Sequence, residues 1–366
     1  MPPNTTLWPI GVHTPGKHLV LRAYLNAWLP ILGMTQGRIV FIDGFAGPGA
    51  YLGGEDGSPI IAIRALNEHV SKNRISAEVA FVFVESDPDR AANLERIVNE
   101  LRPSMPTNAS IHVHRGAFDE TLSDLLDTVG ASGKILAPAF VMVDPFGVSD
   151  TPMSLLSRIL QNPRSELYIS FMYEAINRFK TSPEFGPHLD ALFGTTEWRN
   201  GIEMPESDAR RKFFYDLYTR QLKDAGAKHV VRFELFEGNR HVYTIFFATK
   251  SHVGCDRMKQ AIWSVSPGGE FAFRGSRSGQ LSLLESLGPN REYLRREIRA
   301  KFGGQGAVDI KKMIEWVSGD ETDFHSGHLK STLKEMEQQN ELTAVGPPEK
   351  RRRSGTFAPG TMVTVL

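Results

Sequence analysis

The stretch FIDGFAGPG, residues 41–49, decides the fold because it joins the end of an apolar run to a glycine-rich loop. The overlapping run 38–42 (RIVFI) is mainly apolar and contains β-branched residues, as in a buried strand. Asp43 stands at the end of this predicted strand. The glycines that follow are Gly44, Gly47 and Gly49. A turn without Cβ atoms lets the backbone approach a nucleotide-like ligand, although a purely structural tight turn is the alternative.

The position of the next helix narrows the class of ligand. A phosphate-cradling P-loop needs Gly-Lys-Ser/Thr after its glycines, and this loop has no such sequence. A dinucleotide site favours a helix that starts inside the glycine run, with its N-terminus on the pyrophosphate. Here the helix signal is Ser58-Pro59, a capping serine followed by a proline suited to the first turn. The loop therefore favours a ligand without a pyrophosphate, such as S-adenosylmethionine.

Short apolar runs alternate with helical stretches around this loop. Such strands, separated by helices, indicate a parallel sheet covered on both faces. The predicted strands are 38–42, 78–84, 111–114, 139–143 and 166–171, and the predicted helices are 17–32, 58–69, 88–101, 121–129 and 152–160. Two further runs, 230–235 and 242–248, flank the turn 237–239 and predict a β-hairpin. The expected fold class is α/β, with a mostly parallel, Rossmann-like sheet that ends in an antiparallel hairpin.

The chain changes character near residue 290. Three predicted helices, 291–302, 307–317 and 326–339, precede two strand-like pieces, 342–345 and 361–366, that are separated by a Gly/Pro/Arg-rich stretch. Helices followed by a hairpin with a basic tip are typical of a winged helix. We expect a Rossmann-like domain with an N-terminal helix over residues 1–289 and a winged-helix-like domain over residues 290–366.

The second predicted strand also ends on a carboxylate. In VAFVFVESD, Glu85 stands at the strand end and Ser86 follows it. A carboxylate there can accept both hydrogen bonds of a ribose diol, because ligands of open α/β sheets bind at the carboxyl ends of the strands. A solvated strand end or a helix cap is the alternative for Glu85, although Asp87, directly before Pro88, is the better cap.

The third predicted strand leads into HRGAFD, residues 114–119. The backbone groups of Ala117 and Phe118 are placed to pair with an adenine ring edge. A loop whose Phe118 lies in the core is the alternative.

The fourth predicted strand runs into Asp144, Pro145, Phe146 and Gly147. The lone pair of an exocyclic amine is delocalised into its ring, which makes the amine a poor nucleophile. Acceptors on the Asp144 carboxylate and the Pro145 carbonyl can bind its two N–H groups and localise that pair, while Phe146 stacks on the ring. A sulfonium is already an activated methyl donor, so the protein would contribute placement and a dry pocket. An ordinary helix-entry turn is the alternative.

Six segments together carry a family resemblance. The runs GKHLVLRAYLNAWLPIL, FIDGFAGPG, GEDGSPI, VFVESD, VDPFG and LFGTTEWRNG resemble the three-Cys-motif partner protein (TcmP) family over about residues 13–250. More distantly, the chain resembles class I S-adenosylmethionine-dependent methyltransferases, including adenine-N6 enzymes. The tail is similar to the winged-helix extension that such proteins can carry. Adenine-N6 enzymes usually have Asp-Pro-Pro-aromatic where this chain has Asp-Pro-Phe-Gly, so the resemblance leaves the target atom open.

The resemblance implies a role for each matching residue. The methionine-side loop would comprise Asp43, Gly44, Phe45, Ala46, Gly47 and Gly49. Glu85 would take the ribose role, and Asp144-Pro145-Phe146 would be the catalytic motif. Lys17 would reach the carboxylate of the cofactor, with a solvated lysine as the alternative. The family is named for a partner with three cysteines, and since this chain has only Cys255, those cysteines would belong to the partner.

Basic residues gather locally in the last quarter of the chain. If this region is a winged helix, its third helix enters the major groove and its wing touches the backbone of a nucleic acid. The predicted nucleic-acid contacts are Arg274, Arg277, Lys330, Lys334, Arg351, Arg352 and Arg353. Many winged helices bind protein instead, and that alternative stays open.

Composition excludes several other classes. The 366 residues are 41% hydrophobic, and 42 Lys and Arg balance 42 Asp and Glu, which describes a soluble globular protein and not a general polyanion binder. A single cysteine excludes a disulfide framework and a Cys-based zinc site, and the histidines form no convincing metal set, so no metal is expected. The chain shows no secretory signal and no run long enough to span a membrane, which predicts a cytoplasmic location.

Two functions remain in competition. The first is an S-adenosylmethionine-dependent methyltransferase that acts on an exocyclic amine, adenine N6-like, of a base in DNA or RNA. The second is an accessory protein that binds S-adenosylmethionine and serves a three-Cys-motif protein in a modification or phage- and defence-associated system. A nucleotide-linked dehydrogenase is disfavoured by the late helix start and by the Asp-Pro-Phe-Gly motif.

Overall fold

The computed structural model describes residues 5–11, 14–205, 208–237, 240–265, 272–275, 289–347 and 352–366. Within 236–237, 240–242 and 272–275 only the backbone is described. Three of the predicted nucleic-acid contacts are affected: Arg277 and Arg351 lie outside the described residues, and Arg274 is described by its backbone alone.

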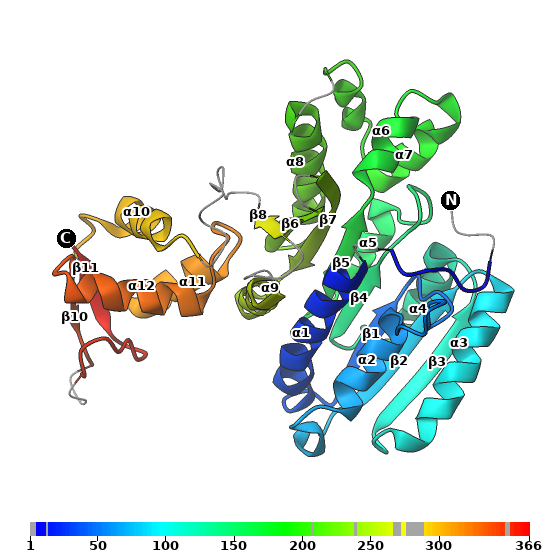
Figure 1. Ribbon diagram of the computed structural model, residues 1–366, viewed down its shortest axis with the longest axis horizontal. Helices are drawn as coiled ribbons and strands as arrows, with labels where there is room; N and C mark the ends of the chain where they lie inside the picture. The colour runs from blue at the N-terminus through cyan, green and yellow to red at the C-terminus, as the bar shows by residue number, and fades with distance from the viewer. Residues whose placement is uncertain are drawn as a thin grey trace.

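Eight of the described strands form one large sheet in the order β3-β2-β1-β4-β5-β7-β6-β8 (Figure 1). Strands β1 to β5 pair in parallel, whereas β7 lies antiparallel between β5 and β6. The expected α/β fold with a mostly parallel, Rossmann-like sheet and an antiparallel hairpin is therefore confirmed. The strands are β1 Arg38–Asp43, β2 Glu78–Glu85, β3 Ala109–Arg115, β4 Ala139–Val143, β5 Glu166–Phe171, β6 His229–Glu237, β7 Arg240–Thr249 and β8 Ala272–Gly275.

Helices cover both faces of this sheet, and each face has its own hydrophobic core. Ile39 and Phe41 of β1 point to one face, and Val40 and Ile42 point to the other, as the alternation of a strand requires. On the first face lie α1 Thr14–Gly33, α2 Ser58–Asn67, α3 Pro88–Leu101 and α9 His252–Val265. On the second lie α4 Phe118–Ala131, α5 Met153–Gln161, α6 Tyr173–Phe179, α7 Gly186–Phe193 and α8 Asp208–Asp224.

The first helix ends within its predicted bounds, although a proline lies inside it. The sequence predicts a helix over 17–32 that ends between Pro30 and Gly33, and α1 begins earlier, at Thr14, and continues past Pro30 to Gly33. Proline has no N–H, so the carbonyl of Asn26, four residues earlier, loses its helical partner. The His69 ring nitrogen lies 2.9 Å from that Asn26 oxygen and supplies the missing hydrogen bond. A contact from outside the helix thus removes part of the penalty for Pro30.

The C-terminal residues form a small unit of three helices and a three-stranded antiparallel sheet of order β10-β11-β9. Its elements are α10 Arg291–Phe302, β9 Ala307–Asp309, α11 Ile310–Ser318, α12 Ser326–Gln338, β10 Leu342–Val345 and β11 Met362–Val365. The helix predicted over 307–317 is confirmed as α11, but its predicted start is wrong, because Ala307 and Val308 pair with β11 and Asp309 caps α11 through the N–H of Lys311. The unit contacts the sheet domain through α9 and α11 (Figure 1).

No helix in the described part of the chain is long and apolar enough to cross a membrane.

A buried carboxyl group ties α1 to the sheet. Glu166 of β5 is 5% exposed and accepts hydrogen bonds from the Tyr24 hydroxyl at 2.6 Å and the Thr249 hydroxyl at 2.9 Å. Burial raises the pKa of Glu166 from 4.5 to about 7. The proton is therefore bound more tightly in the folded protein than in the unfolded chain.

We expect Glu166→Gln to remove a pH dependence of stability. Because the folded pKa is raised, the stabilisation from the bound proton is fully present below pH 4.5 and is lost as pH rises through about 7, by about 3 kcal/mol in total. The amide of the variant cannot ionise, so the free energy of unfolding of the variant minus that of wild type should increase over this window. Urea unfolding at several pH values measures it, and parallel curves for the two proteins would contradict the assignment.

Candidate functional site

Three carboxylates stand at the carboxyl ends of three neighbouring strands. Asp43 ends β1, Glu85 ends β2 and Asp144 follows β4 directly. In the sheet these strands are adjacent, in the order β2-β1-β4. The sequence order reverses around β1, because β2 lies on one side of it and β4 on the other, which is where open α/β sheets bind ligands. The topology thus brings the three predicted carboxylates to one edge.

The glycine loop after β1 is fixed by backbone hydrogen bonds to its neighbours. The Gly44 N–H donates to the Met142 carbonyl at 3.0 Å, and the Ala46 N–H donates to the Val84 carbonyl at 2.9 Å. Gly47 and Gly49 have φ of 62° and 83°, in the left-handed region that disfavours side chains. The loop therefore requires glycine at these two positions, and its course brings backbone close to the strand ends.

Glu85 holds this loop. One carboxylate oxygen accepts from the Gly47 N–H at 2.8 Å, and the other accepts from the Asp87 N–H at 2.8 Å. Each oxygen keeps a second lone pair, so the carboxylate can still receive ribose hydroxyls. Asp87 caps α3 through the N–H groups of Asp89 and Arg90, both at 3.0 Å, so the helix-cap alternative for Glu85 is wrong. Ser86 is exposed beside it.

Asp43 is fully buried and only partly satisfied. Its Oδ1 accepts from the Phe45 N–H at 3.1 Å, whereas Oδ2 has no hydrogen-bond partner. Burial raises the pKa of Asp43 to about 6, although the Ser58 hydroxyl, which makes no hydrogen bond of good geometry to the carboxyl, and the Phe45 N–H oppose the rise. An unsatisfied buried oxygen is costly, so it marks a place where a donor group from a ligand would be stabilising. This is one observation in favour of a polar ligand on the glycine loop.

Asp144 forms an ion pair with Lys17 of α1. The Asp144 side chain is 26% exposed and that of Lys17 is 10% exposed. Burial alone would raise the pKa of Asp144, but the Lys17 ammonium holds it below its usual value. The neighbouring His18 is neutral, because burial and the charge of Lys17 lower its pKa to about 3. Lys17 thus lies in the site, with its charge on the carboxylate of the motif.

An aromatic group from the N-terminus also lies at this edge, and no pattern in the sequence indicates it. Phe146 is 41% exposed and packs edge-on against Trp8, with ring centroids 5.9 Å apart. Trp8 makes a second edge contact with Tyr51 at 5.9 Å. No motif surrounds Trp8, and only the folded chain brings it to Phe146.

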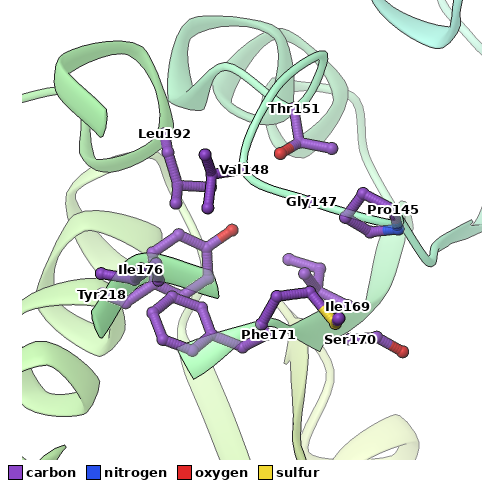
Figure 2. Close-up of a pocket in the computed structure, with 11 residues that line it drawn as sticks. Pro145, Gly147, Val148, Thr151, Ile169, Ser170, Phe171, Ile176, Leu192 and Tyr218 are labelled. Atoms are coloured by element: carbon purple, nitrogen blue, oxygen red, sulfur yellow. The ribbon is translucent and has the colours of Figure 1, made fainter. Parts of the chain in front are cut away.

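A small pocket lies beside the motif. Figure 2 shows the residues that line it, which come from the loop after β4, the end of β5 and helices α6 to α8. Buried hydroxyls of Thr151 and Tyr218 point into it, and neither has a hydrogen-bond partner. Its cavity volume is about 10 Å³, which is room for about one water molecule. That is far below the roughly 300–1,000 Å³ of most ligand sites, so a planar ring could enter only if the loop after β4 moved.

Ala117 and Phe118 lie at the start of α4. Ala117 is the N-cap residue, and the Phe118 ring is buried, with its centroid 5.3 Å from that of Phe45. A Cβ on Gly44 would lie only 2.2 Å from this ring. Phe118 therefore supports the glycine loop with its side chain, as the core alternative expects, while its backbone remains the predicted adenine contact.

The predicted nucleic-acid contacts in the C-terminal unit differ in their surroundings. Lys330 and Lys334 are exposed one turn apart on α12, and Arg353 is exposed as well. Arg352 instead forms an ion pair with Glu337 at 2.6 Å, and its guanidinium lies 5.0 Å from the centre of the Phe357 ring. Arg352 therefore has a structural role in holding the segment before β11 against α12.

The sequence matches no protein-family model and no curated protein. Among solved structures, the chain is similar to Trm1 from Pyrococcus horikoshii in complex with S-adenosyl-L-methionine, with 11% identity, a TM-score of 0.39, and coverage of 99% of this chain and 93% of that one. It is also similar to an O-methyltransferase from Bacillus cereus in complex with SAH, with 14% identity, a TM-score of 0.37, and coverage of 66% of this chain and 84% of that one. For a human methyltransferase 10 domain containing protein the identity is 13% and the TM-score 0.31, with coverage of 63% of this chain and 82% of that one. These scores are low, so the function has to be argued from the site itself.

Proposed function

We propose that the protein is an S-adenosylmethionine-dependent methyltransferase. The observation that carries this proposal is the set of three carboxylates, Asp43, Glu85 and Asp144, at the ends of adjacent strands around a glycine loop. The unpartnered Asp43 oxygen and the glycine backbone fit a ligand that is polar at one end and close to the main chain. The absence of a helix start inside the loop favours a ligand without a pyrophosphate, since α2 begins only at Ser58.

Three groups of residues are proposed to bind the three parts of the donor. The methionine part lies along residues 43–49, with Lys17 as the candidate for its carboxylate. The ribose lies by Glu85 and Ser86, and the adenine edge meets the backbone of Ala117 and Phe118. Lys17 has two candidate partners in this arrangement, the donor carboxylate and Asp144, and it holds Asp144 in the structure.

The Asp-Pro-Phe-Gly motif is proposed to bind and activate the amine that receives the methyl group. Bound S-adenosylmethionine supplies an activated methyl group. Asp144 and the Pro145 carbonyl accept the two N–H bonds of an exocyclic amine, which localises its lone pair on nitrogen, and Phe146 stacks on the ring. The nitrogen gains positive charge as its bond to the methyl carbon forms, and the Asp144 carboxylate stabilises that charge. Because its pKa is lowered, Asp144 acts as a hydrogen-bond acceptor, and the surplus proton leaves to solvent.

The acceptor we propose is a base of DNA or RNA, with adenine N6 as the model for the amine. The pocket beside Pro145 contains two unpartnered hydroxyls, of Thr151 and Tyr218, and the polar edge of a base would satisfy them once the loop after β4 moves to admit it. We propose that residues 290–366 are a winged-helix-like domain that holds the nucleic acid through Lys330, Lys334 and Arg353, which are exposed.

A second candidate function is an accessory protein that binds S-adenosylmethionine for a three-Cys-motif partner, as the resemblance to the TcmP family suggests. The observation that favours it is the Lys17–Asp144 ion pair, because a neutralised carboxylate is a weaker acceptor for an amine. An accessory protein would bind the donor and transfer no methyl group by itself.

Donor binding tests the common premise of both candidates. We expect calorimetry to show one S-adenosylmethionine per chain, and Glu85→Ala to weaken binding at least about 10-fold, since it removes the ribose acceptor and releases Gly47. Glu95→Ala is the matched control, because Glu95 is exposed on α3. A wild-type protein that does not bind S-adenosylmethionine would rule out both functions.

A further inference from the structure

The N-terminal residues 5–11 lie against the carboxyl edge of the sheet, and Trp8 makes their contacts with the site. The Leu52 N–H donates to the Trp8 carbonyl at 2.9 Å, which fixes this segment to the loop after β1. The Trp8 ring meets Tyr51 and Phe146 edge-on. The Arg90 guanidinium lies over the Trp8 ring, 5.0 Å from its centre.

These partners place Trp8 across three strand ends. Arg90 lies in α3 just after β2, Tyr51 follows the glycine loop after β1, and Phe146 follows β4. A Cβ built on Gly47 would lie 3.7 Å from the indole, so the ring is next to the glycine loop itself. Because β2, β1 and β4 are neighbours in the sheet, the indole spans the region in which the donor is proposed to lie.

We propose that Trp8 is a binding residue for the sulfonium donor, and that residues 5–11 form a strap that covers the donor on the glycine loop. The Trp8 ring contacts two further aromatic rings here, those of Tyr51 and Phe146. Aromatic faces attract cations, and a sulfonium is a cation with methyl and methylene groups that pack on a ring. The strap therefore adds both burial and charge recognition. This inference rests on the proposed donor binding.

The charge of the donor gives the inference a specific signature. S-adenosylmethionine is a cation at sulfur, and S-adenosylhomocysteine is a neutral thioether there. We expect Trp8→Ala to raise the Kd for S-adenosylmethionine about 10-fold or more and to raise the Kd for S-adenosylhomocysteine less. Trp8→Phe keeps an aromatic face and should retain most of the affinity. Trp8→Leu keeps apolar cover alone and should lose the preference for the cation.

Fluorescence gives an independent readout of the same contact. The other tryptophans, Trp28, Trp198, Trp263 and Trp316, lie in the cores or against them, whereas Trp8 lies at the site. Titration with S-adenosylmethionine should change the emission of wild type and leave that of Trp8→Phe nearly unchanged. Thr5→Ala, at an exposed position of the same strap, is the matched control and should behave as wild type.

The outcomes separate this inference from the proposed function. If wild type does not bind S-adenosylmethionine, the proposed function fails. If wild type binds and Trp8→Ala binds equally well or more tightly, the proposed function stands and the role of Trp8 is overturned. Equal losses for both ligands would overturn the charge recognition. Thermal unfolding of each variant shows that it is folded, and Trp8→Leu decides the case if Trp8→Ala is not, since an unchanged preference for S-adenosylmethionine in Trp8→Leu would overturn the role of Trp8.

Discussion

Asp144→Ala is expected to abolish methyl transfer while donor binding persists. The variant removes the hydrogen-bond acceptor that localises the lone pair of the amine. It also removes the negative charge that stabilises the positive charge developing on the nitrogen, so the rate of methyl transfer should fall at least about 100-fold. Donor binding should be retained, because the glycine loop and Glu85 are untouched and the loss of Asp144 frees Lys17 for the donor carboxylate. Transfer of a labelled methyl group to purified DNA and RNA, followed by mass spectrometry of the nucleosides, measures the loss and identifies the methylated atom.

Two further variants make this result specific. Asp144→Asn keeps an acceptor oxygen and loses the charge, so its activity should fall between wild type and Asp144→Ala. Asp124→Ala is the matched control, since Asp124 is exposed on α4. Transfer by Asp144→Ala at a rate close to wild type would contradict the assignment of the motif. Donor binding by wild type without transfer to either nucleic acid would favour the accessory function.

Lys259→Met is expected to cause the largest loss of stability. Lys259 of α9 is 1% exposed, and its ammonium donates to the carbonyls of Val317 at 2.8 Å and Phe324 at 3.0 Å, and to that of Gly319. Methionine keeps the apolar stem and leaves three carbonyls without their charged donor. Hydrogen bonds to a charged group contribute about 1.5–3 kcal/mol each, so the free energy of unfolding should fall by about 3 kcal/mol or more.

The same variant should separate the two parts of the chain. Lys259 joins α9 to the segment between α11 and α12, and Asp256 of α9 adds hydrogen bonds to Ser318 at 3.1 Å and to the Ser326 N–H at 2.7 Å. Loss of the Lys259 contacts should therefore turn one unfolding transition into two in calorimetry. Lys312→Met, at an exposed position on α11, is the control. A change below about 1 kcal/mol with a single transition would show that Lys259 does not hold the interface.

The strands and most of the helices of the sheet domain could be predicted from the sequence because their signals are local. A strand that is buried on both faces is mostly apolar, which β4 and, apart from Glu166 and Ser170, β5 show at the predicted bounds Ala139–Val143 and Glu166–Phe171. The start of α3 follows from Asp87 and Pro88 alone. The helix α8 Asp208–Asp224 could not be predicted in this way, since its mean composition is polar and its buried face includes Arg210.

The sequence by itself determined which residues stand at the strand ends, because each strand and the carboxylate after it are neighbours in the chain. Only the tertiary structure decided what those carboxylates meet. Lys17 reaches Asp144 across 127 positions, and His69 satisfies Asn26 across 43. Ala307 and Val308 form a strand because β11 lies beside them. Trp8 reaches the site in the same way. Such contacts depend on how helices and loops pack against the sheet, and no spacing between neighbouring residues records that packing.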